Sequence, residues 1–339
     1  MTPTLHDVAR LAGVSIKTVS NVVNGHPHVR PSTRDAVERA VAELGYTPNL
    51  TARNLRSGRT GAIALAVPDL ALSYFAELAG MVIARAEERG VVVLVEQTGG
   101  ERERERELLR SPRLGLTDGL ILSPLGLDAA DLAARPGSYP TVLLGERVFD
   151  APLDHVTMRN AEAARAATSH LLASGRRRVA VLGAHEGAAD GAAGLRLQGH
   201  RAALAAAGVP FDPALVVATR FWDRSGGADA VRDLVARGVE FDAVFGLNDT
   251  LALGAIRALQ EARRRVPDDV AVVGFDDLDE ARYSIPSLTT IDPGRRWIAQ
   301  AAVDSLLERV GGASVGDSRV LSAEFVLRVR ESAPGPTRG

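Results

Sequence analysis

The sequence predicts a small all-α head followed by an α/β body of two doubly wound, parallel-sheet lobes. Residues 1–60 contain three short helical patterns and no strand-like run. From Gly61 onwards, short apolar runs alternate with amphipathic segments, which is the order expected for parallel strands covered by helices. About ten such runs are too many for one compact sheet, so we expect two lobes.

The composition is that of a folded protein with a large core. Of the 339 residues, 46% are hydrophobic and 24% are charged, which excludes global disorder. The absence of cysteine excludes disulfides, thiolate metal sites and a cysteine nucleophile. No apolar run reaches about 18 residues, and the N-terminus lacks the apolar core of a secretion signal, so we expect a cytoplasmic protein.

The helices of the head are predicted from their caps and apolar stripes. Thr4 and Asp7 have the spacing of a capping box, while Ser15 and Ser32 can each cap a further helix. The predicted helices run from Thr4 to Ala12, from Ser15 to Val23 and from Ser32 to Leu44. The stripe Val19, Val22 and Val23 should pack on Val8, Leu11, Val37 and Val41. Three helices with a turn around Gly13 outline a helix-turn-helix.

The body contains strand and helix patterns in alternation. The expected strands are Ala62–Val67, Val91–Val95, Gly119–Leu122, Val142–Leu144, Val179–Leu182, Leu215–Ala218, Ala243–Leu247 and Val270–Phe275. The expected helices between them are Ser73–Arg89, Glu162–Ala173, Leu195–Ala207 and Thr250–Arg264. We interpret the charged segment Glu101–Arg110 as a solvated helix face without a function.

Charge is distributed unevenly along the chain. Residues 1–60 hold eight Lys and Arg against four acids, a net charge of +4, and the remainder carries −6. A basic head on an acidic body is typical of a polyanion-binding module joined to a sensing or catalytic module.

The second predicted helix has the pattern of a helix that reads DNA. With the valine stripe turned inward, helical spacing turns Ile16, Lys17 and Asn21 outward. Lys can donate to guanine, Asn can pair with adenine, and an apolar side chain can touch a thymine methyl. The small donors Ser15, Thr18 and Ser20 suit phosphate contacts. The alternative is a surface helix of a small all-α domain.

Residues 4–25 (TLHDVARLAGVSIKTVSNVVNG) and 29–68 (VRPSTRDAVERAVAELGYTPNLTARNLRSGRTGAIALAVP) resemble the lactose/galactose-repressor family of bacterial transcription regulators. The resemblance continues to about residue 330 and implies a body like that of periplasmic binding proteins. It divides the chain into a DNA-binding domain (1–48), a hinge (49–60), an effector-binding and dimerisation domain (61–330) and a flexible tail (331–339). Within the body, lobe 1 should comprise about 61–159 and 291–322, and lobe 2 about 160–290 and 323–330.

The resemblance also assigns DNA contacts. Base-reading side chains fall on Ile16, Lys17 and Asn21, and phosphate contacts on Thr4, Ser15, Thr18, Ser20, Asn24, His28, Thr33, Tyr46 and Asn49. Many relatives have Arg at the position of Asn21, so the preferred base at that position should differ here. In the hinge, Leu55 resembles the leucine that enters the minor groove, beside the contact residues Ala52 and Arg56. The hinge is short and poor in apolar residues, so it should be marginal alone in water. A plain flexible linker would explain its arginines but not this leucine.

A ligand site is expected between the lobes, at the carboxyl ends of the strands. The resemblance places effector contacts at Tyr74, Phe75, Arg196, Asn248, Asp276 and either Phe221 or Trp222, with Glu146 and Arg147 as possible additions. An Arg, an Asn and an Asp beside an aromatic wall suit hydroxyl-rich ligands. Trp222 has a core role as its alternative, Asp249 is interpreted as a helix cap, and Asp277 as a loop organiser. Two departures from the family concern the ligand's charge: Met158-Arg159-Asn160, where relatives usually have an acid before the Asn, and Asp190.

Enzyme motifs are missing from the sequence. It has no GxGxxG after a strand, no Walker loop, no HExxH and no GxSxG, and its seven histidines are scattered. We therefore expect no catalysis, no metal and no cofactor.

The predicted function is that of a homodimeric transcription regulator that binds double-stranded operator DNA. We expect a repressor of carbohydrate-utilisation genes, controlled by a sugar or sugar derivative. Ser73–Arg89 and the region around Leu278–Ser284 resemble the family's interface between bodies. The alternative is a sugar-binding or transport component without a DNA role, against which the +4 head and the missing secretion signal argue.

Overall fold

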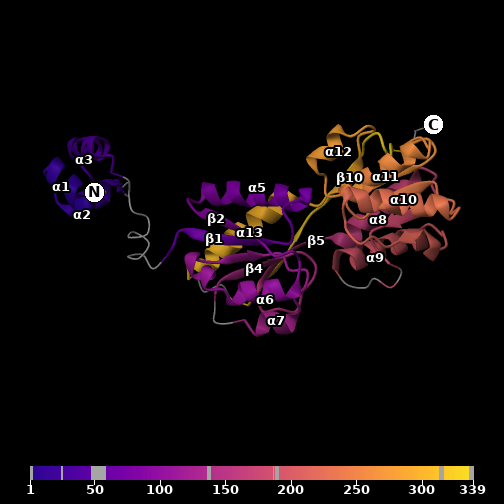
Figure 1. The fold of residues 1–339 in the computed structure, drawn as a ribbon, viewed down its shortest axis with the longest axis horizontal. Coiled ribbons are helices and arrows are strands. Elements are labelled where there is room, and N and C mark those ends of the chain that lie inside the picture. Colours follow the sequence, from indigo (N-terminus) through magenta and orange to yellow (C-terminus); the bar gives the residue numbers. More distant parts are fainter. Residues whose placement is uncertain are drawn as a thin grey trace. The chain divides into compact units, whose positions relative to one another are not determined.

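The computed structural model describes residues 3–23, 26–46, 59–135, 139–185, 187, 191–312 and 317–335. The chain divides into two compact units, residues 1–60 and 61–339, and each is described by itself below. Figure 1 shows the helices of the first unit and the two sheets of the second.

The first unit contains three helices in its described residues: α1 (Leu5–Ala12), α2 (Ile16–Val23) and α3 (Pro31–Leu44). The predicted capping box is confirmed, because the Thr4 side chain accepts from the Asp7 N–H while the Asp7 carboxylate accepts from the Thr4 N–H. Gly13 ends α1 with a φ of 66°, a value that favours glycine. The prediction that Ser32 caps α3 is wrong: the helix begins at Pro31, whose fixed φ and missing N–H suit a first helical position.

The core of the first unit is the predicted valine cluster with one exception. Val8, Val19, Val22 and Val37 are buried together with Ala40 and Tyr46, and Val23 and Val41 pack on them. Leu11 was expected in this core but is 45% exposed. The one-turn spacing from Val8 therefore does not carry Leu11 into the interface with α3.

The second unit contains two six-stranded sheets in its described residues. The first has the order β11-β5-β4-β3-β1-β2, all parallel, with β1 (Ala62–Val67), β2 (Val92–Gln97), β3 (Leu120–Leu122), β4 (Thr141–Leu144), β5 (Asp154–Met158) and β11 (Val320–Ala323). The second has the order β12-β10-β9-β8-β6-β7, with β6 (Val179–Leu182), β7 (Val216–Val217), β8 (Ala243–Gly246), β9 (Ala271–Phe275), β10 (Thr289–Asp292) and β12 (Val326–Arg328). Only the β10–β12 pair is antiparallel among these described strands.

Helices cover both faces of each sheet, as predicted for doubly wound lobes (Figure 1). Lobe 1 contains α5 (Ser73–Glu88), α6 (Arg102–Arg110), η1 (Pro112–Leu116), α7 (Ala129–Ala133) and α13 (Arg295–Val310). Lobe 2 contains α8 (Asn160–Ala173), α9 (Gly191–Ala206), η2 (Pro213–Leu215), α10 (Arg224–Ala236), α11 (Asp249–Glu261) and α12 (Asp279–Tyr283). Strand alternation explains the layers: Ile63 and Leu65 of β1 are buried with α5 and α13, whereas Ala64 and Ala66 are buried with α6 and α7.

The chain passes between the lobes three times: from β5 to α8, from β10 to α13, and from β11 to β12. After β12 it stays in lobe 2. Residues 331–333 were assigned to a flexible tail, but Ser332 and Ala333 are buried there. The Ser332 hydroxyl donates to the carbonyl of Val272 and accepts from the N–H of Thr289, which fixes the segment to β9 and β10.

The charged segment around α6 is not the fully solvated face that we expected. Glu105 is completely buried, and its carboxylate accepts from the backbone N–H groups of Leu125, Gly126 and Leu127 at 2.9–3.0 Å. A carboxylate that satisfies three N–H groups of one loop fixes the path of that loop after β3. The alternating signs of the segment concealed this one inward-facing acid.

Glu105→Gln should destabilise the second unit, because an amide cannot accept all three bonds and leaves a buried donor unpaired. We expect a loss of about 1–3 kcal/mol in the free energy of unfolding, measured by chemical denaturation. Glu107→Gln, on the exposed side of the same helix, is the matched control. Equal midpoints for the two variants would show that Glu105 contributes nothing through these bonds.

Candidate functional site

The largest group of sequence-predicted ligand residues lies in one cleft between the two lobes. The cleft has a volume of about 590 Å³ and is lined from both sheets at the carboxyl ends of their strands. All nine expected side chains line it: Tyr74, Phe75, Glu146, Arg147, Arg196, Phe221, Trp222, Asn248 and Asp276. The side chains that the family resemblance indicated come from distant parts of the sequence and lie together in this cleft.

Arg196 of α9 is the central cation of the cleft. It is 4% exposed, its Nε donates to Asn160 Oδ1 at 2.7 Å, and its Nη1 donates to the carbonyl of Leu247. Its guanidinium lies 3.5 Å from the centroid of the Phe275 ring. Burial lowers the pKa of Arg196, although nearby acids, Asp276 first among them, oppose this shift. The hydrogen bonds that Nε and Nη1 donate hold the side chain in place, and Nη2 faces Asp276.

Asp276 follows β9 and is the central acid. Its side chain is 5% exposed, and its Oδ1 lies 4.0 Å from Arg196 Nη2, beyond hydrogen-bond length. Within the described part of the chain, its carboxylate is influenced by burial and by nearby charges and accepts no hydrogen bond. Burial raises the pKa of Asp276 to about 6, while Arg196 and Arg295 oppose the rise. The carboxylate is thus a desolvated acceptor with capacity left for a ligand.

Glu146 lies across the cleft, after β4. Its carboxylate accepts from the Thr157 hydroxyl and, at 3.3 Å, from the backbone N–H of Met158. Burial raises the pKa of Glu146, against the lowering effects of Thr157 and Arg196. Its neighbour Arg147 is exposed at the rim. Glu146 is therefore held by lobe 1, whereas Arg147 is free to reach a ligand.

The aromatic side chains form two walls. Tyr74 and Phe75, at the start of α5, pack edge to face with centroids 5.1 Å apart. Burial and the charges of Asp276 and Glu146 raise the pKa of Tyr74, so its hydroxyl is a donor at neutral pH. On lobe 2, Phe221 is 58% exposed, whereas the Trp222 Nε1 donates to the carbonyl of Gly183 at 3.0 Å.

The roles of Asn248 and Asp249 differ from the expectation that Asp249 caps α11. Asn248 is the N-cap: its Oδ1 accepts from the Leu251 N–H at 2.9 Å, and its Nδ2 donates to the carbonyl of Trp222. Asp249 is completely buried and accepts from the Leu278 N–H and the Thr290 hydroxyl. Burial, then the charge of Asp276, raises the pKa of Asp249 to about 8. Asp249 thus ties α11 to the segment after β9.

The residues Met158 and Arg159, at which the sequence departs from the family, lie in two different places. Met158 lines the cleft, with its sulfur 3.5 Å from Arg196 Nη2. Arg159 does not line the cleft: it pairs with Glu324 at 2.6 Å, which joins two of the three connections between the lobes. Asp190 lies outside the described residues.

Several cleft residues escaped the sequence reasoning. They are mostly uncharged or lie beside the expected ones: Asp69, Ser123, Thr157, Arg220 and Thr250. The same post-strand rule could have found Asp69 and Ser123, which follow β1 and β3. Thr250 is fixed by a hydrogen bond to the carbonyl of Trp222, a long-range contact that leaves no local signal.

In the first unit, α2 presents part of the expected DNA-reading surface. Lys17 is exposed, while Asn21, one turn further, is partly exposed. Ile16 was expected to face outward, but it is partly buried and packs on the core of the unit. The Ser15 hydroxyl caps the helix by accepting from the Thr18 N–H at 3.1 Å.

The remaining DNA-contact assignments differ in their surroundings. Thr4 caps α1, Thr18 and Ser20 are partly exposed on α2, His28 is exposed, Thr33 is partly exposed on α3, and Tyr46 is 8% exposed in the core. Asn24, Asn49, Ala52, Leu55 and Arg56 lie outside the described residues.

No helix that could cross a membrane and no group of metal-ligating side chains occurs in the described ranges.

Comparison with known proteins matches both units. Residues 4–49 match the family described as bacterial regulatory proteins, lacI family, and residues 168–333 match a periplasmic binding protein-like domain. The regulator CelR of Thermobifida fusca is 39% identical, covering 97% of this chain and 98% of its own length.

Solved structures agree with this match. A complex of the transcriptional regulator CelR with cellobiose is 35% identical, covers 97% of this chain and 99% of that chain, and has a TM-score of 0.70. The lac repressor dimer bound to operator and the anti-inducer ONPF is 31% identical, covers 99% of this chain and 100% of that chain, and has a TM-score of 0.83. With a relative above 30% identity along nearly its whole length, this chain belongs to the lacI family of bacterial transcription regulators.

Proposed function

We propose that this protein is a repressor of carbohydrate-utilisation genes whose affinity for operator DNA is controlled by a sugar-like effector in the interlobe cleft. The observation that carries the proposal is that two different candidate binding sites occur in one chain. One is a helix that exposes Lys17 beside Asn21, and the other is the cleft around Arg196 and Asp276.

The chemistry of the cleft supports a hydroxyl-rich effector. Asp276 offers an acceptor, Arg196 and Tyr74 offer donors, and Phe221 offers an exposed apolar face. Sugars combine alternating donor and acceptor hydroxyls with an apolar ring face, which such a set recognises. One similar structure is a complex of CelR with cellobiose, and it makes cellobiose the first candidate to test.

The proposed control is a shift between two arrangements of the lobes. A ligand that contacts both sides of the cleft stabilises the arrangement in which both lobes reach it. It changes operator affinity only as far as it binds one arrangement of the lobes more tightly than the other. In the proposed division, residues 1–48 bind DNA, 49–60 are the hinge and 61–330 bind the effector and dimerise. Leu55 would enter the minor groove and Ala52 and Arg56 would lie beside it.

The rival interpretation, a sugar-binding or transport component without a DNA role, is opposed by the family match over residues 4–49. In the described head, Lys17 lies outside the apolar core and is exposed, so its charge is available to a partner. We propose no catalytic activity.

The direct experiment is a mobility-shift assay with genomic fragments. Retention of one fragment over bulk competitor DNA supports the proposal, and equal affinity for all fragments rejects it.

Two copies of the chain are proposed to associate through lobe 1. Strand β2 lies at the edge of its sheet and exposes Val92, Leu94 and Val95. An exposed apolar edge strand favours association, and the similar lac repressor structure is a dimer. Tyr283, in the interface region expected from the sequence, and Ile285 beside that region are exposed on lobe 2.

Base-reading and phosphate-binding residues should respond differently to substitution. Lys17→Ala and Asn21→Ala should each cost about 1–3 kcal/mol on the operator but little on a scrambled duplex. Arg56→Ala should weaken both duplexes alike and reduce the slope of log K against log salt by about one. Fluorescence anisotropy at several salt concentrations measures both. A uniform loss for all three variants would contradict the assignment.

Effector affinity should fall in mild acid. Hydroxyls that donate to ionised Asp276 favour its charged form, so binding is strongest above the pKa of about 6 and weakens as pH falls through it. Between about pH 7.5 and about pH 5 the affinity should drop roughly tenfold. Asp249, with a pKa of about 8, stays mostly protonated over this range. Calorimetric titrations should show the drop in the wild type and none in Asp276→Asn, and a pH-independent wild type would exclude Asp276 as the acceptor.

Leu94→Asp should convert the dimer to a monomer, since it places a charge in the apolar edge. Sedimentation velocity measures the change. Val326→Asp is the matched control, because Val326 is 48% exposed on β12, the edge strand of the other sheet. A dimer that survives Leu94→Asp, or that is lost equally in the control, would reject this surface.

A further inference from the structure

The segment after β9 contains two consecutive residues in an unusual backbone conformation. Asp276 has a φ of 121° and Asp277 a φ of 51°, and Arg263 is the only other non-glycine residue with positive φ in the described part of the chain. Residues with a side chain rarely adopt positive φ, because it brings the Cβ atom close to the backbone. Such a conformation persists only where surrounding contacts enforce it.

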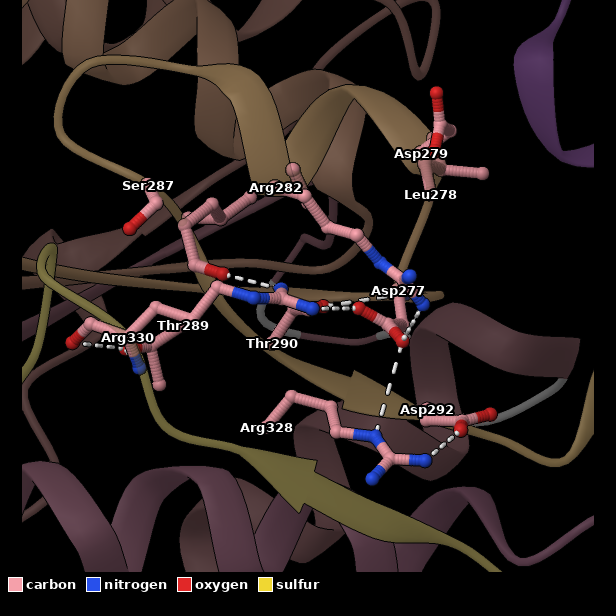
Figure 2. A network of polar contacts seen from close by, with 12 residues as sticks. Asp277, Leu278, Asp279, Arg282, Ser287, Thr289, Thr290, Asp292, Arg328 and Arg330 are labelled. Atoms are coloured by element: carbon pink, nitrogen blue, oxygen red, sulfur yellow. Dashed lines mark hydrogen bonds and ion pairs between the residues drawn. The ribbon is translucent and has the colours of Figure 1, made fainter.

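The Asp277 carboxylate is the centre of those contacts (Figure 2). It is 4% exposed and receives arginines from three positions in the chain. Arg330 Nη2 donates to Oδ1, Arg282 Nη2 approaches Oδ2 at 3.5 Å, and Arg328 Nε lies 3.8 Å from Oδ2. One buried carboxylate thus joins α12, β12 and the chain that follows β12.

Two of the three arginines, Arg330 and Arg328, are themselves fixed by further partners. Arg330 Nη1 also donates to the carbonyl of Leu288 at 2.7 Å, and Arg328 Nη2 also pairs with Asp292 at 2.7 Å. Figure 2 shows Arg328 lying between Asp277 and Asp292. An ion pair with such additional bonds holds its partners in one geometry.

The backbone of the segment is held from the other side. The carbonyl of Asp277 accepts from Arg295 Nη2, and Arg295 Nη1 donates to Glu77 Oε2 at 2.5 Å. The Asp276 N–H donates to the carbonyl of Ile291 at 2.8 Å. The segment is therefore attached to β10, to α13 and, through Glu77, to α5 of lobe 1.

Asp276 has no comparable fixation of its own side chain. Its carboxylate accepts no hydrogen bond in the described part of the chain, and Arg196 Nη2 lies 4.0 Å away. The direction of that carboxylate is consequently set by the backbone that carries it. Asp277 does not line the cleft, so it can act on a ligand only through this backbone.

We propose that Asp277 is a positioning residue of the effector site: its arginine-clamped carboxylate holds the backbone conformation that aims Asp276 at Arg196 and the cleft. The expected effect on sugar affinity rests on the proposed function. The positioning itself concerns only the protein, and it can be tested without a ligand.

Asp277→Asn is the decisive variant. Asparagine has the same shape and tolerates positive φ, but it loses the charge that gathers the three arginines. Asp154→Asn is the matched control: Asp154 is equally buried and is paired with Arg309 and Arg319, but it does not line the cleft. Both variants should lower the melting temperature.

Cellobiose is the probe, and calorimetry measures its affinity. Asp277→Asn should bind it roughly tenfold or more weakly, the size of effect that loss of an outer-shell contact has at metal sites. Asp154→Asn should stay within about twofold of the wild type, since distant sites act independently. Wild-type affinity in Asp277→Asn, or an equal loss in Asp154→Asn, would overturn the proposal.

Crystal structures of the wild type and Asp277→Asn give the readout that needs no sugar. We expect Asp276 to leave its positive φ in the variant and its carboxylate to turn away from Arg196. If the wild type does not bind cellobiose, that choice of effector fails, and the structures alone decide the positioning role. An unchanged Asp276 would then overturn it. Should Asp277→Asn not fold, Arg330→Gln, which removes the closest cation, provides the same comparison with the same two outcomes.

Discussion

The candidate effector site depends on two buried side chains of opposite charge that do not bond to each other. Arg196 and Asp276 are each about 5% exposed, yet they stand 4.0 Å apart, so neither satisfies the other. Charges withdrawn from water are costly unless they are paired and hydrogen-bonded. The protein fixes the guanidinium with two other acceptors and fixes the acid through its backbone, which leaves the gap between them for a polar ligand. The parallel sheets, whose carboxyl ends meet at this point, supply the cleft in which the gap lies.

How much of the fold could be predicted depended on where each strand finds its partners. Ala62–Val67 and Val179–Leu182 were predicted to the residue, because apolar strands buried on both faces have a local signal. β5 and β10 were not predicted. Asp154 of β5 is buried by Arg309 and Arg319, and the threonines of β10 are satisfied by Ser332 and Asp249. Polar residues that become buried through partners distant in the chain look like loop residues in the sequence.

The same reasoning separates what was found in the candidate site from what was missed. The nine expected side chains were chosen from the family resemblance and from the position of ligand sites at the carboxyl ends of parallel strands, and all nine line one cleft. The role of each side chain depends on its neighbours in space, which cannot be read from the sequence. Asn248 takes the cap expected of Asp249, Arg159 pairs across the lobe connections, and Asp277 gathers arginines from positions 282 to 330. Topology was therefore predictable, whereas the hydrogen-bond network that gives each residue its task was not.

The central claim is that occupancy of the cleft governs the affinity of the head for DNA. It is tested most directly by titrating a sugar into the protein bound to its fluorescently labelled operator, in parallel for the wild type and Asp276→Asn. The account predicts that the sugar changes the operator affinity of the wild type and leaves that of the variant unchanged, with equal operator affinity for the two proteins when no sugar is present. An equal change in both proteins at the same sugar concentration, or no change in the wild type with any sugar that it binds, would contradict it.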